Sequence, residues 1–189
     1  MRLPLIAPRE MSETQRALYE DVLAGIARNF TAFETRDEGT GALIGPWNAM
    51  LHEPEMGAAL WNLSKVTSAV SVLPAPVREI AILVVGAHYN APYELYAHAS
   101  VAESMGMSRE RLSVLCAGLR PDDLDPAERA AFEATSALLR GGILPEPCYR
   151  NAVENLGQKG TNELFFLVGL YCAVALLLNA YDVPVPERS

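Results

Sequence analysis

The chain has 189 residues, half of them hydrophobic, and carries 15 basic against 23 acidic side chains, a formal charge of −8 at pH 7. This composition supports a buried core and is unlike that of a disordered chain. Because an acidic surface repels phosphate backbones, and no local run of Lys or Arg is present, nucleic acid is excluded as an expected partner.

Cysteine use and the N-terminal residues bear on the cellular compartment. The three cysteines, Cys116, Cys148 and Cys172, are odd in number, widely spaced and without a Cys-x-x-Cys pair. That pattern argues against a disulfide framework, a zinc site and a dithiol redox motif, and it is typical of thiols in a reducing cytosol. The N-terminal stretch lacks the apolar core of a signal peptide. We therefore expect a cytoplasmic protein.

The hydrophobic pattern is helical from the N-terminus onward. Ser12 and Gln15 form a capping-box pattern before a helix whose apolar residues recur every four positions. Residues 36–47 are rich in Gly and charge and are predicted to form a loop. A second helix follows, with Pro54 in its first turn.

Six further helices are predicted beyond the second. We expect them to begin near Val77, Pro92, Ser108, Asp125, Pro145 and Thr161. The last contains the longest apolar run, residues 165–178, which is shorter than the roughly 20 residues that span a bilayer. A helix apolar on nearly all sides is buried in a core or against another subunit. With no convincing strand pattern, residues 1–189 are predicted to form one all-α, single-domain helical bundle.

Glu94 and His98 are the first candidates for chemistry. They are four residues apart, so on one helix their side chains share a face, and a carboxylate can orient an imidazole for proton transfer. Glu79 lies in the preceding helix and approaches the same place if the two helices pack antiparallel. A buried carboxyl group there has a raised pKa and can donate a proton.

Structural alternatives remain open for these residues. Glu94 falls at the third helical position if Pro92 is the first, and Glu79 follows Pro76 in the first turn of its helix; glutamate commonly caps backbone N–H groups there. His98 is equally compatible with a hydrogen-bonded histidine in a core.

This stretch resembles the signature of the carboxymuconolactone decarboxylase family, which also contains the alkyl-hydroperoxide reductase partner proteins (the AhpD type). In the peroxidase branch the pattern is Glu, then Cys twelve, Cys fifteen and His nineteen residues on. Glu79 and His98 hold the outer positions, whereas Ala91 and Glu94 stand where the cysteines would be. "GPWNAMLHEPEMG" and "LVGLYCAVALLLNAYDVPVP" are similar to segments of longer members, so the resemblance covers most of the chain.

The missing cysteines separate the two activities that the resemblance implies. A dithiol peroxidase requires a low-pKa thiolate and a resolving thiol, so we do not expect peroxidase activity. Tyr93, Glu94 and His98 resemble the cysteine-free, decarboxylase-like branch, which works without metal or organic cofactor. The implied reaction is loss of carbon dioxide from a carboxylated unsaturated lactone or a related intermediate of aromatic degradation. His98 would donate the proton, Glu94 would hold its tautomer, and Glu79 would be a second proton carrier.

Candidate pocket residues lie on either side of this signature. Trp47, Asn48 and His52 follow the Gly-rich loop and are predicted to close over a planar ligand, although Trp47 could instead fill the core. Tyr89 and Tyr93 are predicted to line the same cavity, or else to serve packing.

Three expectations concern what binds to the chain. A carboxylated substrate calls for an arginine, and Arg78, Arg2 and Arg9 are the candidates; without one, a neutral or aromatic ligand fits better. No histidine spacing supports a metal site. The resemblance implies a homotrimer or a homohexamer.

A thiol-dependent antioxidant protein and a non-catalytic binding module remain the alternative functions.

Overall fold

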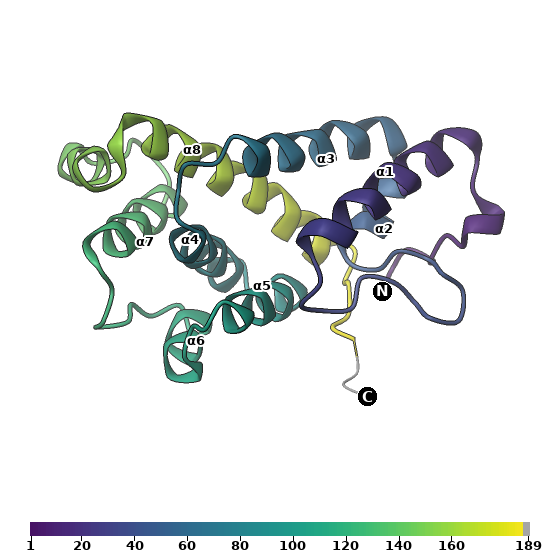
Figure 1. Cartoon of the computed structure of the whole chain (residues 1–189), viewed down its shortest axis with the longest axis horizontal. Helices are drawn as coiled ribbons and strands as arrows, with labels where there is room; N and C mark the ends of the chain where they lie inside the picture. The colour runs from purple at the N-terminus through teal and green to yellow at the C-terminus, as the bar shows by residue number, and fades with distance from the viewer. Residues whose placement is uncertain (187–189) are drawn as a thin grey trace.

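The computed structural model describes residues 1–186, apart from the side chains of residues 28 and 29, and over this part of the chain it is helical without a regular sheet (Figure 1). A short 3₁₀ turn, η1 (Pro8–Glu10), precedes the first helix. The helices are α1 (Glu13–Asn29), α2 (Pro46–His52), α3 (Pro54–Ala69), α4 (Ala75–His88), α5 (Pro92–Ser104), α6 (Arg109–Cys116), α7 (Pro126–Leu139) and α8 (Glu146–Ala180). The predicted all-α class is confirmed.

The capping box predicted at Ser12 is present, and a second one begins α7. The Ser12 side chain accepts a hydrogen bond from the backbone of Gln15, whose side chain bonds back to the N-cap, and Asp125 and Glu128 do the same at the start of α7. Each box satisfies backbone N–H groups that the first helical turn leaves without partners. The first-turn prolines of α3 and α5 also stand where the sequence predicts them.

One element differs from the prediction. Residues 46–52, for which no helix is predicted, form the short helix α2, which begins with Pro46 directly after Gly45. The predicted seventh and eighth helices are the two parts of α8, which meet at a kink where the backbone of Gly157 is non-helical (φ 71°, ψ 165°). A glycine tolerates that conformation without the strain that a side chain would add, so the chain bends there and continues as a helix.

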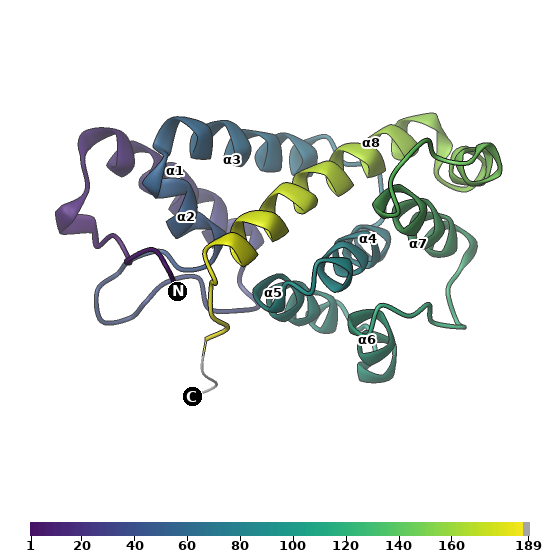
Figure 2. The ribbon, with the colours of Figure 1, turned by 180° about the vertical axis from the view of Figure 1, so that it is seen from behind.

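The helices form two groups connected by α8. Figures 1 and 2 show α4 between α5, α6, α7 and α8, and they show α1, α2 and α3 gathered at the other end of the molecule. One core lies where α4 packs on α7 and α8, and a second surrounds Trp47 and Trp61 between α1, α2 and α3. The C-terminal part of α8 contacts both α2 and α5, so side chains from both groups meet beside it.

By length and composition alone, α8 is apolar enough to cross a membrane. In the structure, Leu164, Leu167 and Val168 of this helix lie in the core formed with α4 and α7. About 39% of the most apolar 18-residue window of α8 is buried inside the protein, so packing in the core accounts for part of the apolar run.

Candidate functional site

Glu79 and His98 are brought together by the packing of α4 against α5. His98 Nδ1 donates a hydrogen bond to Glu79 Oε2 across 2.9 Å, and both residues are buried. Since a carboxylate only accepts hydrogen bonds, this contact fixes which ring nitrogen carries the proton and leaves Nε2 for another partner. The structure therefore forms an oriented carboxylate–imidazole pair.

Glu94 does not make the contact with His98 that the spacing on α5 suggests. Neither of its carboxyl oxygens has a hydrogen-bond partner among the described residues, although the residue is only 2% exposed. The expectation that Glu94 holds the tautomer of His98 is therefore wrong, because Glu79 from α4 already occupies Nδ1. The capping alternative is also wrong, since Glu94 accepts no backbone hydrogen bond. Burial raises the pKa of Glu94 well above its ordinary value.

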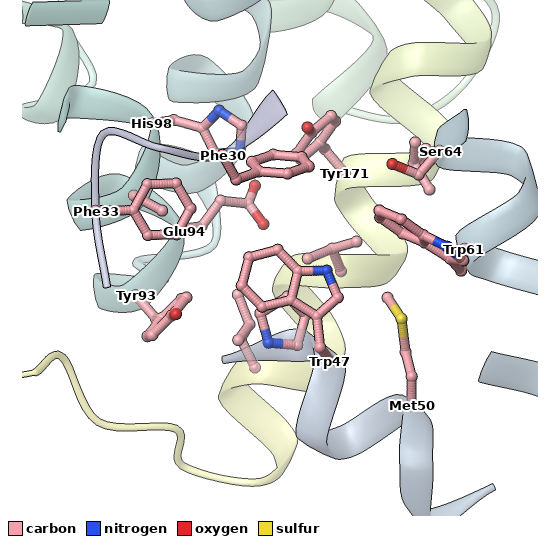
Figure 3. A pocket seen from close by; sticks show the side chains of 15 residues that line it. Phe30, Phe33, Trp47, Met50, Trp61, Ser64, Tyr93, Glu94, His98 and Tyr171 are labelled. Carbon is pink, nitrogen blue, oxygen red and sulfur yellow. The ribbon is translucent and has the colours of Figure 1, made fainter. Parts of the chain in front are cut away.

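The unpartnered carboxyl group of Glu94 borders a cavity of about 50 Å³. Figure 3 shows this carboxyl group directed toward the space between the surrounding side chains. Most of the wall is aromatic or aliphatic, and no Lys or Arg of the described chain belongs to it. The lining residues are Phe30, Phe33, Pro46, Trp47, Met50, Trp61, Ser64, Tyr93, Glu94, Ala97, His98, Leu170, Tyr171, Val174 and Leu178.

Two of the predicted pocket residues, Trp47 and Tyr93, line this cavity. Trp47 does so from the first turn of α2 and at the same time belongs to the core beside α1. The ring of Phe33 stacks on Trp47 with centroids 6.1 Å apart and an interplanar angle of 10°. Trp47 therefore both lines the cavity and fills part of the core, as the two interpretations of the sequence predict.

Asn48 and His52 do not line the cavity. The Asn48 side chain accepts a hydrogen bond from the Ile6 backbone and donates one to the Pro4 carbonyl, both at 3.1 Å. His52 Nε2 lies 3.0 Å from the same carbonyl. These contacts fasten the N-terminal segment to α2, because an extended segment without helical hydrogen bonds needs side-chain partners for its backbone. The prediction that these two residues contact a ligand is therefore not supported.

Tyr89 also lies outside the cavity. It forms the C-cap of α4, and its carbonyl accepts a 2.7 Å hydrogen bond from the Asn179 side chain near the end of α8. Tyr89 thus connects the ends of two helices.

Four aromatic residues of the cavity wall were not predicted from the sequence: Phe30, Phe33, Trp61 and Tyr171. They come from the end of α1, the following connection, α3 and α8. Tyr171 lies edge-to-face with His98, with ring centroids 4.8 Å apart and an interplanar angle of 89°. Their spacing in the sequence is that of ordinary core residues, and only tertiary packing distinguishes them.

The position of Tyr93 depends on Gly45. A Cβ atom at residue 45 would lie 2.4 Å from Cζ and Oη of Tyr93, and the backbone there has φ 66°. We expect Gly45→Ala to lower the free energy of unfolding by about 2–3 kcal/mol, through backbone strain together with displacement of the tyrosine. Gly142→Ala is the matched control, because φ is 81° and a Cβ would meet nothing within 4 Å. Equal losses in urea unfolding would contradict the packing argument.

The candidate arginines are engaged away from the cavity. Arg78 pairs with Glu163, Arg2 donates to the Ala180 carbonyl, and Arg9 pairs with Glu10. The described residues contain no group of three or more His, Cys, Asp and Glu side chains placed to hold a metal ion.

Comparison with known proteins shows which family the segment that contains the site resembles. Residues 54–137, from α3 to α7, match the model of the carboxymuconolactone decarboxylase family, and this segment contains Glu79, Glu94 and His98. No curated protein sequence matches the chain.

Solved structures share the fold over most of the chain. The debrominase Bmp8 superposes with a TM-score of 0.72 at 15% identity, covering 93% of this chain and 90% of that one. A cysteine-to-alanine variant of that debrominase, in complex with 2,3,4-tribromopyrrole, superposes with a TM-score of 0.72 at 16% identity. The match covers 97% of this chain and 92% of the debrominase chain. A third structure is a protein of unknown function from Agrobacterium tumefaciens, described as a candidate antioxidant defence protein AhpD. It superposes with a TM-score of 0.66 at 11% identity, covering 82% of this chain and 100% of that chain. The chain therefore has the AhpD-like all-α fold, and its residues 54–137 are similar to the carboxymuconolactone decarboxylase family.

Proposed function

We propose that the protein is a proton-transfer enzyme of the lyase type, acting at a ring carbon of a small unsaturated compound such as a lactone. The observation that carries this proposal is the 2.9 Å contact between His98 Nδ1 and Glu79 Oε2 at the wall of the cavity. A histidine held in one tautomer by a carboxylate has a free second nitrogen, which is the arrangement of a general acid or base.

Decarboxylation of a carboxylated lactone is the form of this chemistry that the family suggests. The bond between the ring carbon and the carboxylate breaks, its electron pair moves into the conjugated lactone carbonyl, and carbon dioxide leaves. His98 Nε2 then delivers a proton to the ring carbon, and Glu79 stabilises the imidazolium before that transfer. Since no Lys or Arg among the described residues lines the cavity, we propose that protonated His98 provides the positive charge for a bound carboxylate.

Thiol chemistry is the less favoured alternative. None of the three cysteines lines the cavity. Burial raises the pKa of Cys116, and burial likewise raises that of Cys172, whereas a peroxidatic cysteine needs a lowered pKa. We expect no hydroperoxide turnover that depends on a cysteine. Hydroperoxide turnover that is present in the wild type and lost in Cys172→Ser would contradict this proposal.

A ring-sized ligand requires side chains to move. The cavity of about 50 Å³ is smaller than the roughly 150 Å³ that an engineered cavity uses to hold benzene. Phe30 and Phe33 lie at the end of α1 and in the segment after it, and both are only partly buried. The other aromatic residues of the cavity wall belong to packed helices. We therefore propose that the rings of Phe30 and Phe33 move aside when the substrate binds.

The direct test of the proposed function is ultraviolet-monitored consumption of 4-carboxymuconolactone with simultaneous detection of carbon dioxide. Turnover by the purified protein supports the lyase assignment. Consumption without carbon dioxide indicates another proton transfer on the same ring. Binding without any reaction would move the protein to the class of binding modules.

We also propose that the protein is a cytoplasmic homo-oligomer that associates through α8. Phe166 and Leu176 of this helix are 66% and 53% exposed, and a Cβ at Gly169 between them would meet nothing within 4 Å. Exposed apolar side chains beside a glycine on one helix face can pack against a second copy of the chain. We expect light scattering to give a trimer or a hexamer, and Phe166→Asp to give a smaller species with unchanged helix content. A monomeric native protein would contradict this proposal.

A further inference from the structure

The cavity contains polar groups that the proton-transfer pair does not use. Both oxygens of Glu94 and the indole nitrogen of Trp61 are buried without a hydrogen-bond partner, and both residues line the same cavity. Buried polar atoms are nearly always paired, so the Glu94 carboxyl group, which is directed into the cavity, indicates a ligand that supplies the missing partner.

The surroundings of Glu94 determine the charge it can carry. The ionisable groups that line the cavity with it are His98 and Tyr93 on α5 and Tyr171 on α8. Cys172 on α8, whose pKa is raised by burial, lies near enough for Glu94 to raise that pKa further. No Lys or Arg of the described chain lines the cavity. The imidazole of His98 is bonded to Glu79. An unpaired buried carboxylate costs several kcal/mol, so such a group takes up a proton instead. As a carboxylic acid, Glu94 presents an O–H donor to the cavity.

Tyr171 supplies a second uncharged donor. Its ring lies against His98, and it lines the same cavity. Burial raises the pKa of its hydroxyl, with a further contribution from Glu79, so the phenol keeps its proton. Figure 3 shows Tyr171 and Glu94 on neighbouring walls of the cavity.

We propose that uncharged Glu94 and the hydroxyl of Tyr171 together bind the carbonyl oxygen of the substrate and stabilise the enolate that forms on it. The inference rests on the proposed function and names its substrate class: a small ring with a conjugated ketone or lactone carbonyl. Ligands that offer only donors, or no polar atom, leave Glu94 unpartnered and bind weakly.

This assignment divides the chemistry between two sets of groups. When the carbon bond breaks, its electron pair passes into the ring and places negative charge on the carbonyl oxygen, where Glu94 and Tyr171 donate hydrogen bonds. His98 then gives its proton to carbon, and the enolate returns to a carbonyl. Donors that meet an oxyanion in a water-poor site stabilise the transition state more than the ground state. A neutral carboxyl group beside a tyrosine is an established arrangement for this purpose.

The first test examines the protonation of Glu94 without any turnover. In infrared difference spectra between the wild type and Glu94→Gln, we expect the carbonyl stretching band of a protonated carboxyl group at neutral pH, shifting in D₂O. Detection of carboxylate bands alone would overturn the proposal.

The second test measures binding of 4-nitrophenol, whose oxygen imitates that of an enolate and whose absorption spectrum reports its state. Glu94→Leu removes both oxygens, and we expect its affinity to fall at least tenfold, because a hydrogen bond to a charged oxygen is lost. We expect the same loss for Tyr171→Phe. Glu94→Gln keeps an uncharged donor of similar shape and should bind within about threefold of the wild type. Thr135→Val, which removes a buried, unpartnered hydroxyl outside the cavity, is the control.

Wild-type affinity in Glu94→Leu, with helix content retained in circular dichroism, would overturn the proposal even if lactone turnover were found. Conversely, absence of lactone turnover together with the expected spectra and binding pattern would reject the lyase assignment and leave the oxygen-binding role in place.

Discussion

His98→Ala is expected to lower kcat/KM for lactone turnover by about 10²–10⁴-fold, the range that a positioned general acid or base contributes. The variant removes the only histidine among the residues that line the cavity and leaves Glu79 without its partner. His88→Ala is the matched control, because His88 lies at the end of α4 and outside the cavity. It should keep turnover within about twofold of the wild type.

Glu79→Gln separates positioning from charge at the same site. The amide still offers an oxygen to His98 Nδ1 but no longer stabilises the imidazolium. We expect an intermediate loss, smaller than that of His98→Ala, together with a change in the pH profile of kcat/KM. If His98→Ala keeps full activity while circular dichroism shows an intact fold, His98 is not the proton donor.

Glu163→Ala is expected to cost about 3–5 kcal/mol of unfolding free energy, the range measured when one partner of a buried ion pair is removed. Its side chain is 7% exposed and that of Arg78 is 15% exposed. Glu163 accepts hydrogen bonds from Arg78 Nη1 at 2.6 Å, the backbone of Val72 at 2.7 Å and of Leu73 at 3.2 Å, and the Ser71 hydroxyl. It thus connects α8 to the α3–α4 turn. Glu154→Ala, at an exposed position of the same helix, is the control.

The same residue gives stability a defined pH dependence. Burial raises the pKa of Glu163, but the hydrogen bonds from Ser71, Val72, Arg78 and Leu73 outweigh it, so its pKa in the folded protein is lowered. For a lowered carboxyl pKa, the stabilisation is present above the unfolded value of about 4.3 and is lost as pH falls through the folded value. Urea unfolding from pH 6 to pH 3 should therefore show a smaller decrease for Glu163→Gln than for the wild type. Parallel decreases would contradict this account.

Local patterns in the sequence predict most of the helices. Ser12, Ser108 and Asp125 indicate where their helices begin because a capping side chain acts within its own first turn. Helix α2 is not predicted because its seven residues are too few for a periodic pattern. The two parts of α8 are predicted as separate helices because a glycine normally marks the end of a helix, and the kink between them lies at Gly157.

The site is less predictable because its contacts cross between helices. Spacing on α5 suggests that Glu94 is the partner of His98, yet the bond comes from Glu79 on α4. Asn48 and His52 are polar residues after a Gly-rich loop, but their partners belong to the N-terminal segment, far away in the sequence. The aromatic wall from Phe33 to Tyr171 is assembled from several separate elements, and no local pattern distinguishes such residues from core.

The measurement that tests the central claim most directly is hydrogen–deuterium exchange at the acidic ring carbon of an unsaturated γ-lactone in D₂O, followed by proton NMR. It reports proton transfer at carbon whether or not a carboxylate leaves. The account predicts that the wild-type protein accelerates exchange and that Glu79→Gln accelerates it less. With His98→Ala, the exchange rate should equal the rate in buffer without protein. A wild-type rate equal to that in buffer, or equal acceleration by His98→Ala, would contradict it.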